Sequence, residues 1–258
     1  MTSTSDLTST NTTKNKSSVS ETGHAKNVAN FQDLISFATG YGAPYNPTKT
    51  ILKLPNLIAL YATGQTDIAT VVTDNTAYNN KVNERFTEFS TVKTLSTRLV
   101  NALEATDASP EKIKDAKGFN RKMQGKKTLP ISEPIDTNTP APTTISSSQQ
   151  SYDQQIQHLA GLNSVLLSEP SYAPNENDLK TTTVTTKINT LTTKNKEVSI
   201  AHTKISNSRI KRDKTIYGKD TGIVDVALEV KKYVKSLFGA SSPEYAQISG
   251  IEFKRTKK

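Results

Sequence analysis

The side chains that most often do chemistry in proteins are sparse in this chain. Its 258 residues include no cysteine and only three histidines, His24, His158 and His202. The lack of cysteine excludes disulfides, thiolate nucleophiles and cysteine-ligated zinc. No histidine has a second histidine or a carboxylate at the spacing of metal ligands. We therefore expect neither a metal site nor a cofactor.

Signatures of known catalytic sites are also missing. The sequence contains no GxSxG, no HExxH, no EF-hand loop and no glycine-rich phosphate loop. Gly40-Tyr41-Gly42 precedes prolines, which is typical of a helix stop. The sequence thus names no catalytic residue and favours a protein that is not an enzyme. Two carboxylates facing each other across a cleft, as in glycoside hydrolases, would contradict this expectation.

Two basic clusters are the candidates for a binding site. They follow two similar stretches of sequence and comprise Arg121, Lys122, Lys126 and Lys127 in the first, and Lys254, Arg255, Lys257 and Lys258 in the second. A net charge of +9 suits attraction to nucleic acid or to an anionic surface. Aromatic residues that could stack on bases are few beside the clusters. We favour a solubilising role and keep anion binding as the alternative.

Charged residues at heptad spacing offer a similar choice. They are Lys180, Lys187 and Lys194 in one stretch, and Asp67, Asp74 and Glu88 in another. A basic stripe could bind phosphates. Charges beside an apolar helical seam commonly pair across two helices instead. We expect such ion pairs, and we expect Asn195 to fix the register of the seam.

Apolar spacing predicts the elements that carry these groups. Residues 30–39 have one apolar helical face and stop at Gly40. A heptad pattern from about residue 54 to 105 predicts a long coiled-coil-like helix that begins near Pro55, with a possible bend at 90–97. The pattern returns at 184–216, and 223–238 predicts a separate amphipathic helix. Hydrophobic content of 33% suits long helices with narrow buried stripes.

Several motifs occur twice. Tyr45, Pro47, Leu52 and Lys53 recur at one constant interval as Tyr172, Pro174, Leu179 and Lys180. Ser109-Pro110-Glu111 and Ser242-Pro243-Glu244 are matching helix starts, each with a serine cap and a proline in the first turn. These matches predict an internal duplication. The predicted fold is an all-α, elongated helical bundle of two pseudo-equivalent helical hairpin units.

Composition sets the expected domain boundaries. Residues 1–26 are a Thr/Ser-rich stretch that we expect to be a disordered tail. Residues 27–124 form the first helical repeat and 151–258 the second. Residues 125–150, rich in Pro, Thr and Ser, are the linker between them.

The sequence resembles a family of bacterial hypothetical proteins of similar length from about Asn27 onward. The segments that carry the resemblance are FQDLISFATGYGAPYN, SYDQQIQHL, YAPNENDLK and TGIVDVALEVKKYVKSLFGASSPEYAQISGIEF. The resemblance implies a bacterial source. It supplies no activity and no site residue.

These observations favour a non-enzymatic helical scaffold or protein-binding module, with self-assembly as one form of that binding. The alternative is a sequence-independent binder of nucleic acid or anionic surfaces through the basic clusters. A membrane-active helical toxin is a third class, which the lack of an apolar hairpin opposes. No apolar run is long enough to span a bilayer, and the N-terminus lacks the apolar core of a secretory signal. We expect a cytoplasmic, soluble protein.

Overall fold

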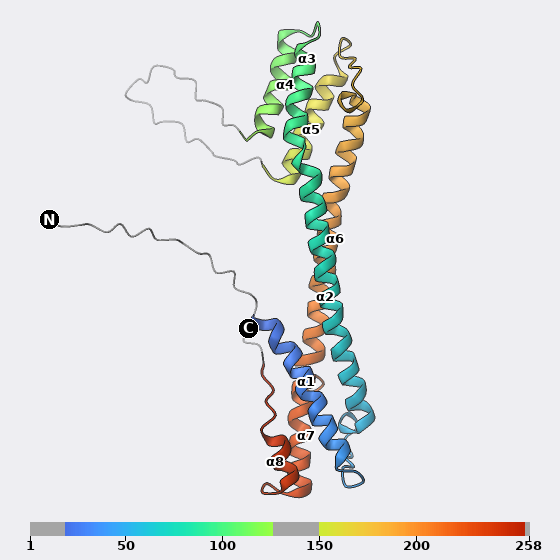
Figure 1. The fold of residues 1–258 in the computed structure, drawn as a ribbon, viewed down its shortest axis with the longest axis vertical. Coiled ribbons are helices and arrows are strands. Elements are labelled where there is room, and N and C mark those ends of the chain that lie inside the picture. The colour runs from blue at the N-terminus through green and yellow to red at the C-terminus, as the bar shows by residue number, and fades with distance from the viewer. Residues whose placement is uncertain (1–18, 126–149, 256–258) are drawn as a thin grey trace, which may run out of the picture. The chain divides into compact units, whose positions relative to one another are not determined.

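A computed structural model describes residues 19–125 and 150–255 (Figure 1). In this part of the chain all regular structure is helical and no strand occurs. The expected all-α class is confirmed. The helices are α1 (Val19–Gly40), α2 (Leu54–Ser90), α3 (Val92–Glu104), α4 (Pro110–Met123), α5 (Tyr152–Leu167), α6 (Thr181–Tyr217), α7 (Ile223–Phe238) and α8 (Pro243–Ser249). Short 3-10 helices, η1 (Thr50–Leu52) and η2 (Asn177–Leu179), precede α2 and α6.

The two Ser-Pro motifs start helices as predicted. The hydroxyl of Ser109 accepts a hydrogen bond from the backbone N–H of Lys112, 3.4 Å away, and Pro110 begins α4. The hydroxyl of Ser242 accepts from the N–H of Tyr245 at 3.1 Å, and Pro243 begins α8. Each serine satisfies a backbone donor that the first helical turn leaves without an intrahelical partner.

The chain divides into two compact units. Unit 1 comprises the residues up to Thr73 and those from Ser206 onward, and unit 2 comprises Asp74–Ile205. Each unit therefore combines part of the first predicted repeat with part of the second. The long helices α2 and α6 each contribute one part to unit 1 and the other part to unit 2.

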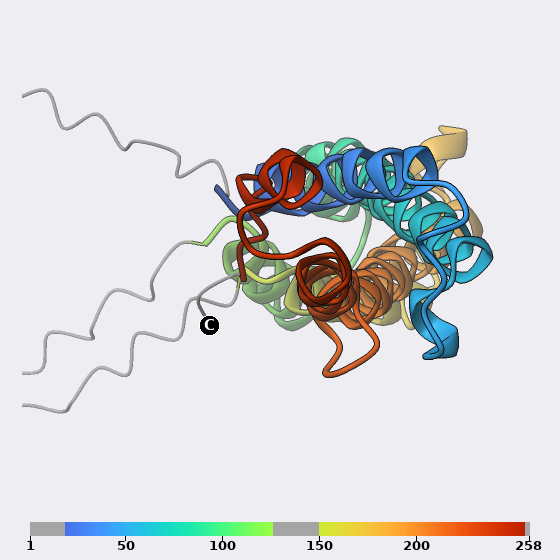
Figure 2. The same cartoon turned by 90° about the horizontal axis from the view of Figure 1, so that it is seen from below.

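Unit 1 is built around an apolar core shared by α1, α7 and the first part of α2. Phe31, Leu34, Leu57, Ile223 and Val230 have no exposed surface in this core. Figure 2 shows α8, in red, beside α1, in blue. A Cβ on Gly64 would lie 2.7 Å from Ile223 Cδ1, so a larger residue at this position would require the Ile223 side chain to shift.

Unit 2 has a second core between α3, α4, α5 and the first part of α6. Leu99, Leu103, Leu159, Leu162 and Leu191 are fully buried there. A Cβ on Gly161 of α5 would lie 2.2 Å from the ring of Phe119 on α4. The glycine therefore makes room for this ring between the two helices.

The expected tail of residues 1–26 is wrong at its C-terminal end, because α1 already begins at Val19. Residues 1–18 lie outside the described residues. His24 is 1% exposed, and its Nδ1 lies 2.8 Å from the hydroxyl of Tyr217. Together with Asn27, Val28 and Phe31 it extends one buried helical face toward the N-terminus. Polar composition concealed this face because its first two members are a histidine and an asparagine.

The first long helix ends earlier than its heptad pattern suggested. Helix α2 stops at Ser90 and α3 starts at Val92, within the Ser/Thr-rich stretch where a bend was expected. Most of the predicted seam residues are buried: Leu57, Val71, Phe89, Leu99, Val184, Leu191, Val198 and Ile205. Val82 is only half-buried. The linker 126–149 lies outside the described residues.

Candidate functional site

The first basic cluster lies at the end of α4 in unit 2. Arg121 and Lys122 are exposed in the last helical turn, where cations interact favourably with the helix dipole. The amine of Lys122 lies 5.8 Å from the centre of the Phe119 ring. Lys126 and Lys127 lie outside the described residues. Two of the four cluster members thus lie on the surface of unit 2.

The second cluster is engaged in contacts within unit 1. Arg255 forms an ion pair with Asp225 in the first turn of α7, and Lys254 Nζ lies 3.0 Å from Glu252. The backbone of Lys254 is also held by Asn27, whose amide donates to its carbonyl at 2.8 Å and whose oxygen accepts from its N–H at 3.0 Å. These contacts tie the end of the chain to α1 and α7, while the side chain of Lys254 stays 79% exposed. Lys257 and Lys258 lie outside the described residues.

The heptad charges of unit 2 pair between α2 and α6, as expected. Lys187 Nζ lies 2.7 Å from Glu88, and Lys194 Nζ lies 2.8 Å from Glu84. The hydrogen bond from Lys194 is the main cause that lowers the pKa of Glu84. Lys180 differs, because its amine donates to the side chain of Asn177 at 2.8 Å. The three lysines thus form no common basic stripe for phosphate.

Two buried carboxylates belong to the same kind of pairing. Asp67 in unit 1 is 1% exposed and lies 2.9 Å from the amine of Lys211. Asp74 in unit 2 is 3% exposed and lies 2.9 Å from the amine of Lys204. Burial of a charge is costly without a partner. These lysines therefore allow α2 to bury acidic residues along its packed face.

A polar layer interrupts the apolar seam of unit 2. Arg85 donates to the Asn195 oxygen at 2.8 Å, and the Asn195 amide donates to Asp153 at 2.7 Å. The Arg85 guanidinium also lies 4.1 Å from the centre of the Tyr152 ring. A cavity of about 630 Å³ adjoins this layer, and His202 is on its wall. Because such a layer penalises other alignments of the helices, the expected register role of Asn195 agrees with these contacts.

The two Tyr-x-Pro turns make the same hydrogen bond. The hydroxyl of Tyr45 donates to the Leu52 carbonyl at 2.8 Å, and that of Tyr172 donates to the Leu179 carbonyl at 2.9 Å. Burial raises the pKa of both phenols, that of Tyr172 to about 12. Each tyrosine thereby closes the turn that leads into a long helix, which is the packing role expected of it.

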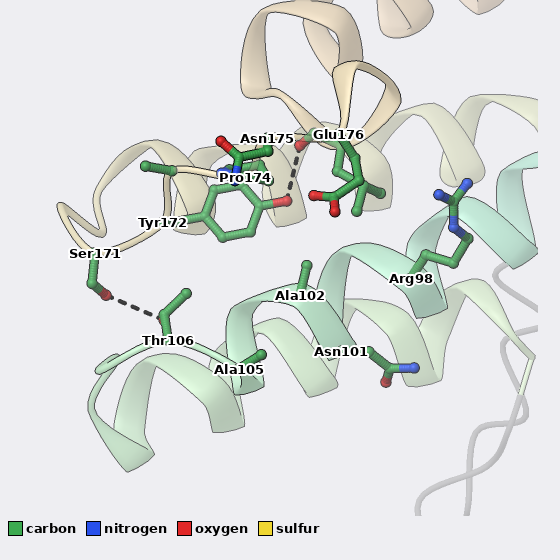
Figure 3. A pocket seen from close by; sticks show the side chains of 12 residues that line it. Arg98, Asn101, Ala102, Ala105, Thr106, Ser171, Tyr172, Pro174, Asn175 and Glu176 are labelled. Carbon is green, nitrogen blue, oxygen red and sulfur yellow. Dashed lines mark hydrogen bonds between the residues drawn. The ribbon is translucent and has the colours of Figure 1, made fainter.

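A cavity of about 470 Å³ lies between the second turn and α3 (Figure 3). Ala102 contributes a small side chain from α3, Ala105 contributes another from the C-cap position just after α3, and Tyr172 contributes its ring from the turn. Arg98, Asn175 and Glu176 add polar groups at its edges. The hydroxyl of Ser171 lies 3.2 Å from that of Thr106 and links the turn to the end of α3. No sequence pattern indicates this cavity, because two segments that are distant in the chain form it.

An exposed, mainly apolar stripe on α2 is a further feature that the apolar spacing of the sequence does not distinguish from a buried face. Within unit 1 its members are spaced four and three apart, namely the apolar Ile58, Ala62, Ala69 and Val72 with the polar Gln65 at the centre. All five are exposed, Ile58 by 52% and Val72 by 61%. The only charged residue of α2 in unit 1 is the buried Asp67. This stripe has the spacing of a helix-packing seam but faces solvent.

The threonines beside the stripe expose less polar surface than their hydroxyl groups suggest. The hydroxyls of Thr63 and Thr66 donate to the carbonyls of Ala59 and Ala62, both at 2.9 Å, and Thr70 donates to Thr66 at 2.8 Å. Because each hydroxyl turns back to its own helix, the methyl group is left as the outward part of the side chain. These threonines therefore add methyl groups and no charge beside the stripe.

Neither a metal site, nor a membrane span, nor a similar protein is found for the described part of the chain. Within residues 19–125 and 150–255, no three histidine, aspartate or glutamate side chains gather as metal ligands would. None of the helices described is long and apolar enough to cross a membrane. Comparison of the chain with protein-family models, curated proteins and solved structures found no match.

Proposed function

We propose that this chain is a non-enzymatic helical scaffold of the cytoplasm that binds a protein partner through the stripe on α2. The observation that carries the proposal is the exposure of Ile58 and Val72 at heptad spacing on a helix that presents no charge around them. Exposed apolar patches rimmed by polar residues commonly mark protein interaction sites. The duplication of the helical hairpin, supported by the two matching Tyr-x-Pro turns, is part of this proposal.

The stripe suits a partner helix of low charge. Apolar residues spaced four and three apart can pack against a second amphipathic helix over about 20 Å, since each residue rises 1.5 Å. A charged partner surface would lose hydration against the stripe without gaining an ion pair. We therefore expect the partner to offer leucine, isoleucine, valine or alanine at the same spacing.

Site-specific crosslinking tests the proposal directly. The chain has no cysteine, so Ala69→Cys introduces a single thiol in the middle of the stripe. A photoreactive group on this thiol should crosslink one protein in extracts of the source, while the same group at Ser208→Cys should not. Crosslinking that persists unchanged in Ile58→Lys/Val72→Lys would overturn the stripe as the binding site.

The basic cluster at the end of α4 supports a second candidate, binding of nucleic acid or an anionic surface. Arg121 and Lys122 are both exposed there, and Lys122 lies over an aromatic ring. Phosphate contacts would make log affinity for an oligonucleotide fall linearly with log salt. Arg121→Glu/Lys122→Glu should then reduce that slope. An apolar helical interface would instead persist in high salt, so the titration separates the two functions.

A further inference from the structure

The two Tyr-x-Pro turns share one backbone shape but carry opposite charge at the same position. Lys49 precedes η1 with φ −67° and ψ 115°, and Glu176 precedes η2 with φ −66° and ψ 118°. The matching tyrosine hydrogen bonds close both turns. Lys49 and Glu176 therefore project from equivalent places on two similar surfaces, one with a cation and the other with an anion.

The neighbouring residues extend this contrast. Residues 42–53 contain Lys49 and Lys53 but no acidic residue, whereas the equivalent residues 169–180 contain Glu169, Glu176 and Asp178 and a single basic residue, Lys180. The acidic turn is unusual in a chain whose net charge is +9. Two turns of opposite sign can attract each other when they belong to different molecules.

The existing contacts leave both turns accessible. Lys49 pairs with Glu229, but its side chain is 53% exposed, and such a surface pair contributes only about 0.2–1 kcal/mol. Lys53 is exposed and makes no ion pair with another described residue. Glu176 is also exposed and forms no ion pair within the part of the chain that the structure describes. Each charge can therefore take a new partner at little cost.

The acidic turn also provides space for a side chain. Figure 3 shows the carboxylate of Glu176 at the cavity between the turn and α3, near Ala102. The cavity holds about 470 Å³, and alanines and the Tyr172 ring form much of its apolar wall. A lysine can place its aliphatic stem along such a wall and its amine at a carboxylate on the rim.

We propose that the basic turn around Lys49 of one molecule docks in the cavity beside Glu176 of a second copy. This contact uses two different surfaces, so it is heterologous and continues from copy to copy until a ring closes or a chain of molecules grows. It goes beyond the proposed partner site, because it involves none of the residues of the stripe on α2. Its electrostatic component makes it strongest at low salt.

Sedimentation velocity of the full chain tests the proposal through charge reversal. The weight-average mass of the wild type should rise above 28.2 kDa with concentration in 20 mM salt and return toward that value in 500 mM salt. Glu176→Lys should weaken self-association at least about tenfold, since like charges then meet at the contact. Asp33→Lys makes the same change in net charge at an exposed position of α1 and should leave association unchanged.

A charge swap separates this contact from a general effect of charge or folding. Lys49→Glu alone should weaken association to a similar extent, but an equal mixture of Lys49→Glu and Glu176→Lys should assemble, because each interface then joins opposite charges. A wild type that stays at 28.2 kDa at every concentration, or a mixture that fails to assemble although both variants melt like the wild type, would overturn the proposal. Ile58→Lys/Val72→Lys should still self-associate, so loss of the partner site and loss of this contact are distinguishable.

Discussion

Tyr172 donates a hydrogen bond of 2.9 Å to the backbone carbonyl of Leu179, and both residues are buried. This bond joins the two ends of the second Tyr-x-Pro turn and fixes the start of α6. The proline and the tyrosine therefore act together, because one restricts the backbone and the other holds the turn closed.

Removal of this hydroxyl should destabilise the protein while its ring still packs. We expect Tyr172→Phe to lower the free energy of unfolding by about 0.5–3 kcal/mol, because the buried Leu179 carbonyl loses its donor. Urea unfolding followed by circular dichroism measures the change. Tyr78→Phe is the matched control, since Tyr78 is half-buried and no hydrogen bond from its hydroxyl is found in the described residues. Equal stability of the two variants would contradict this role for Tyr172.

Alkaline pH should destabilise the same turn. Burial favours neutral Tyr172 and raises its pKa to about 12, against about 10 in an unfolded chain. Its stabilisation is complete below pH 10 and is lost as the pH rises through 12. The unfolding temperature should therefore fall less steeply over this range in Tyr172→Phe than in the wild type. Phenolate absorbance at 295 nm should also show late titration of Tyr172, and a normal pKa would contradict the prediction.

Two phenylalanines three residues apart on α2 should differ sharply in their contribution to stability. Phe89 is 5% exposed and its ring lies 4.6 Å from that of Tyr152, whereas Phe86 is 67% exposed. We expect Phe89→Ala to lower the free energy of unfolding by about 3–5 kcal/mol, because it leaves a cavity in the core of unit 2. Phe86→Ala should change it by less than about 0.5 kcal/mol. Similar losses in both variants would show that this face of α2 is assigned wrongly.

The bond between Asn27 and Lys254 should protect the end of the chain from proteolysis. The Asn27 side chain is 2% exposed and pairs with both backbone groups of Lys254. In Asn27→Ala these groups lose their partner, so trypsin should cleave after Lys254 and Arg255 several times faster. Mass spectrometry of a limited digest measures the rate, and cleavage after Lys122 is the internal reference. If the rate of cleavage after Lys254 and Arg255, relative to that after Lys122, is the same in Asn27→Ala and the wild type, the protective role of the Asn27–Lys254 contact is contradicted.

The sequence predicted the elements that have strong apolar periodicity. The helices from Leu54, Ile223 and Pro243 begin where spacing and capping residues place them, and Lys187 and Lys194 pair with α2 as the heptad suggested. His24 was missed because a single buried histidine carries no apolar signal. The stripe was missed for another reason. Ile58 looks like any other core residue in the sequence, and only the positions of neighbouring helices show that nothing described covers it.

Two predicted boundaries followed composition and did not match the compact units. The repeats were drawn from residues 27–124 and 151–258, yet α2 and α6 each pass from one unit to the other. A long helix has no compositional break where its packing partners change. The boundaries at Thr73 and Ser206 therefore depend on tertiary contacts that local patterns do not encode.

The native mass of the chain in complexes purified from its source tests the scaffold account most directly. We predict that the tagged wild type elutes with a stoichiometric protein partner after nuclease treatment in 500 mM salt, and that Ile58→Lys/Val72→Lys loses this partner. Leu167→Lys, which alters another apolar residue that is 63% exposed, should retain it. A partner that remains bound to Ile58→Lys/Val72→Lys, or a complex that dissociates with nuclease or salt alone, would contradict the proposed role of the stripe in a scaffold.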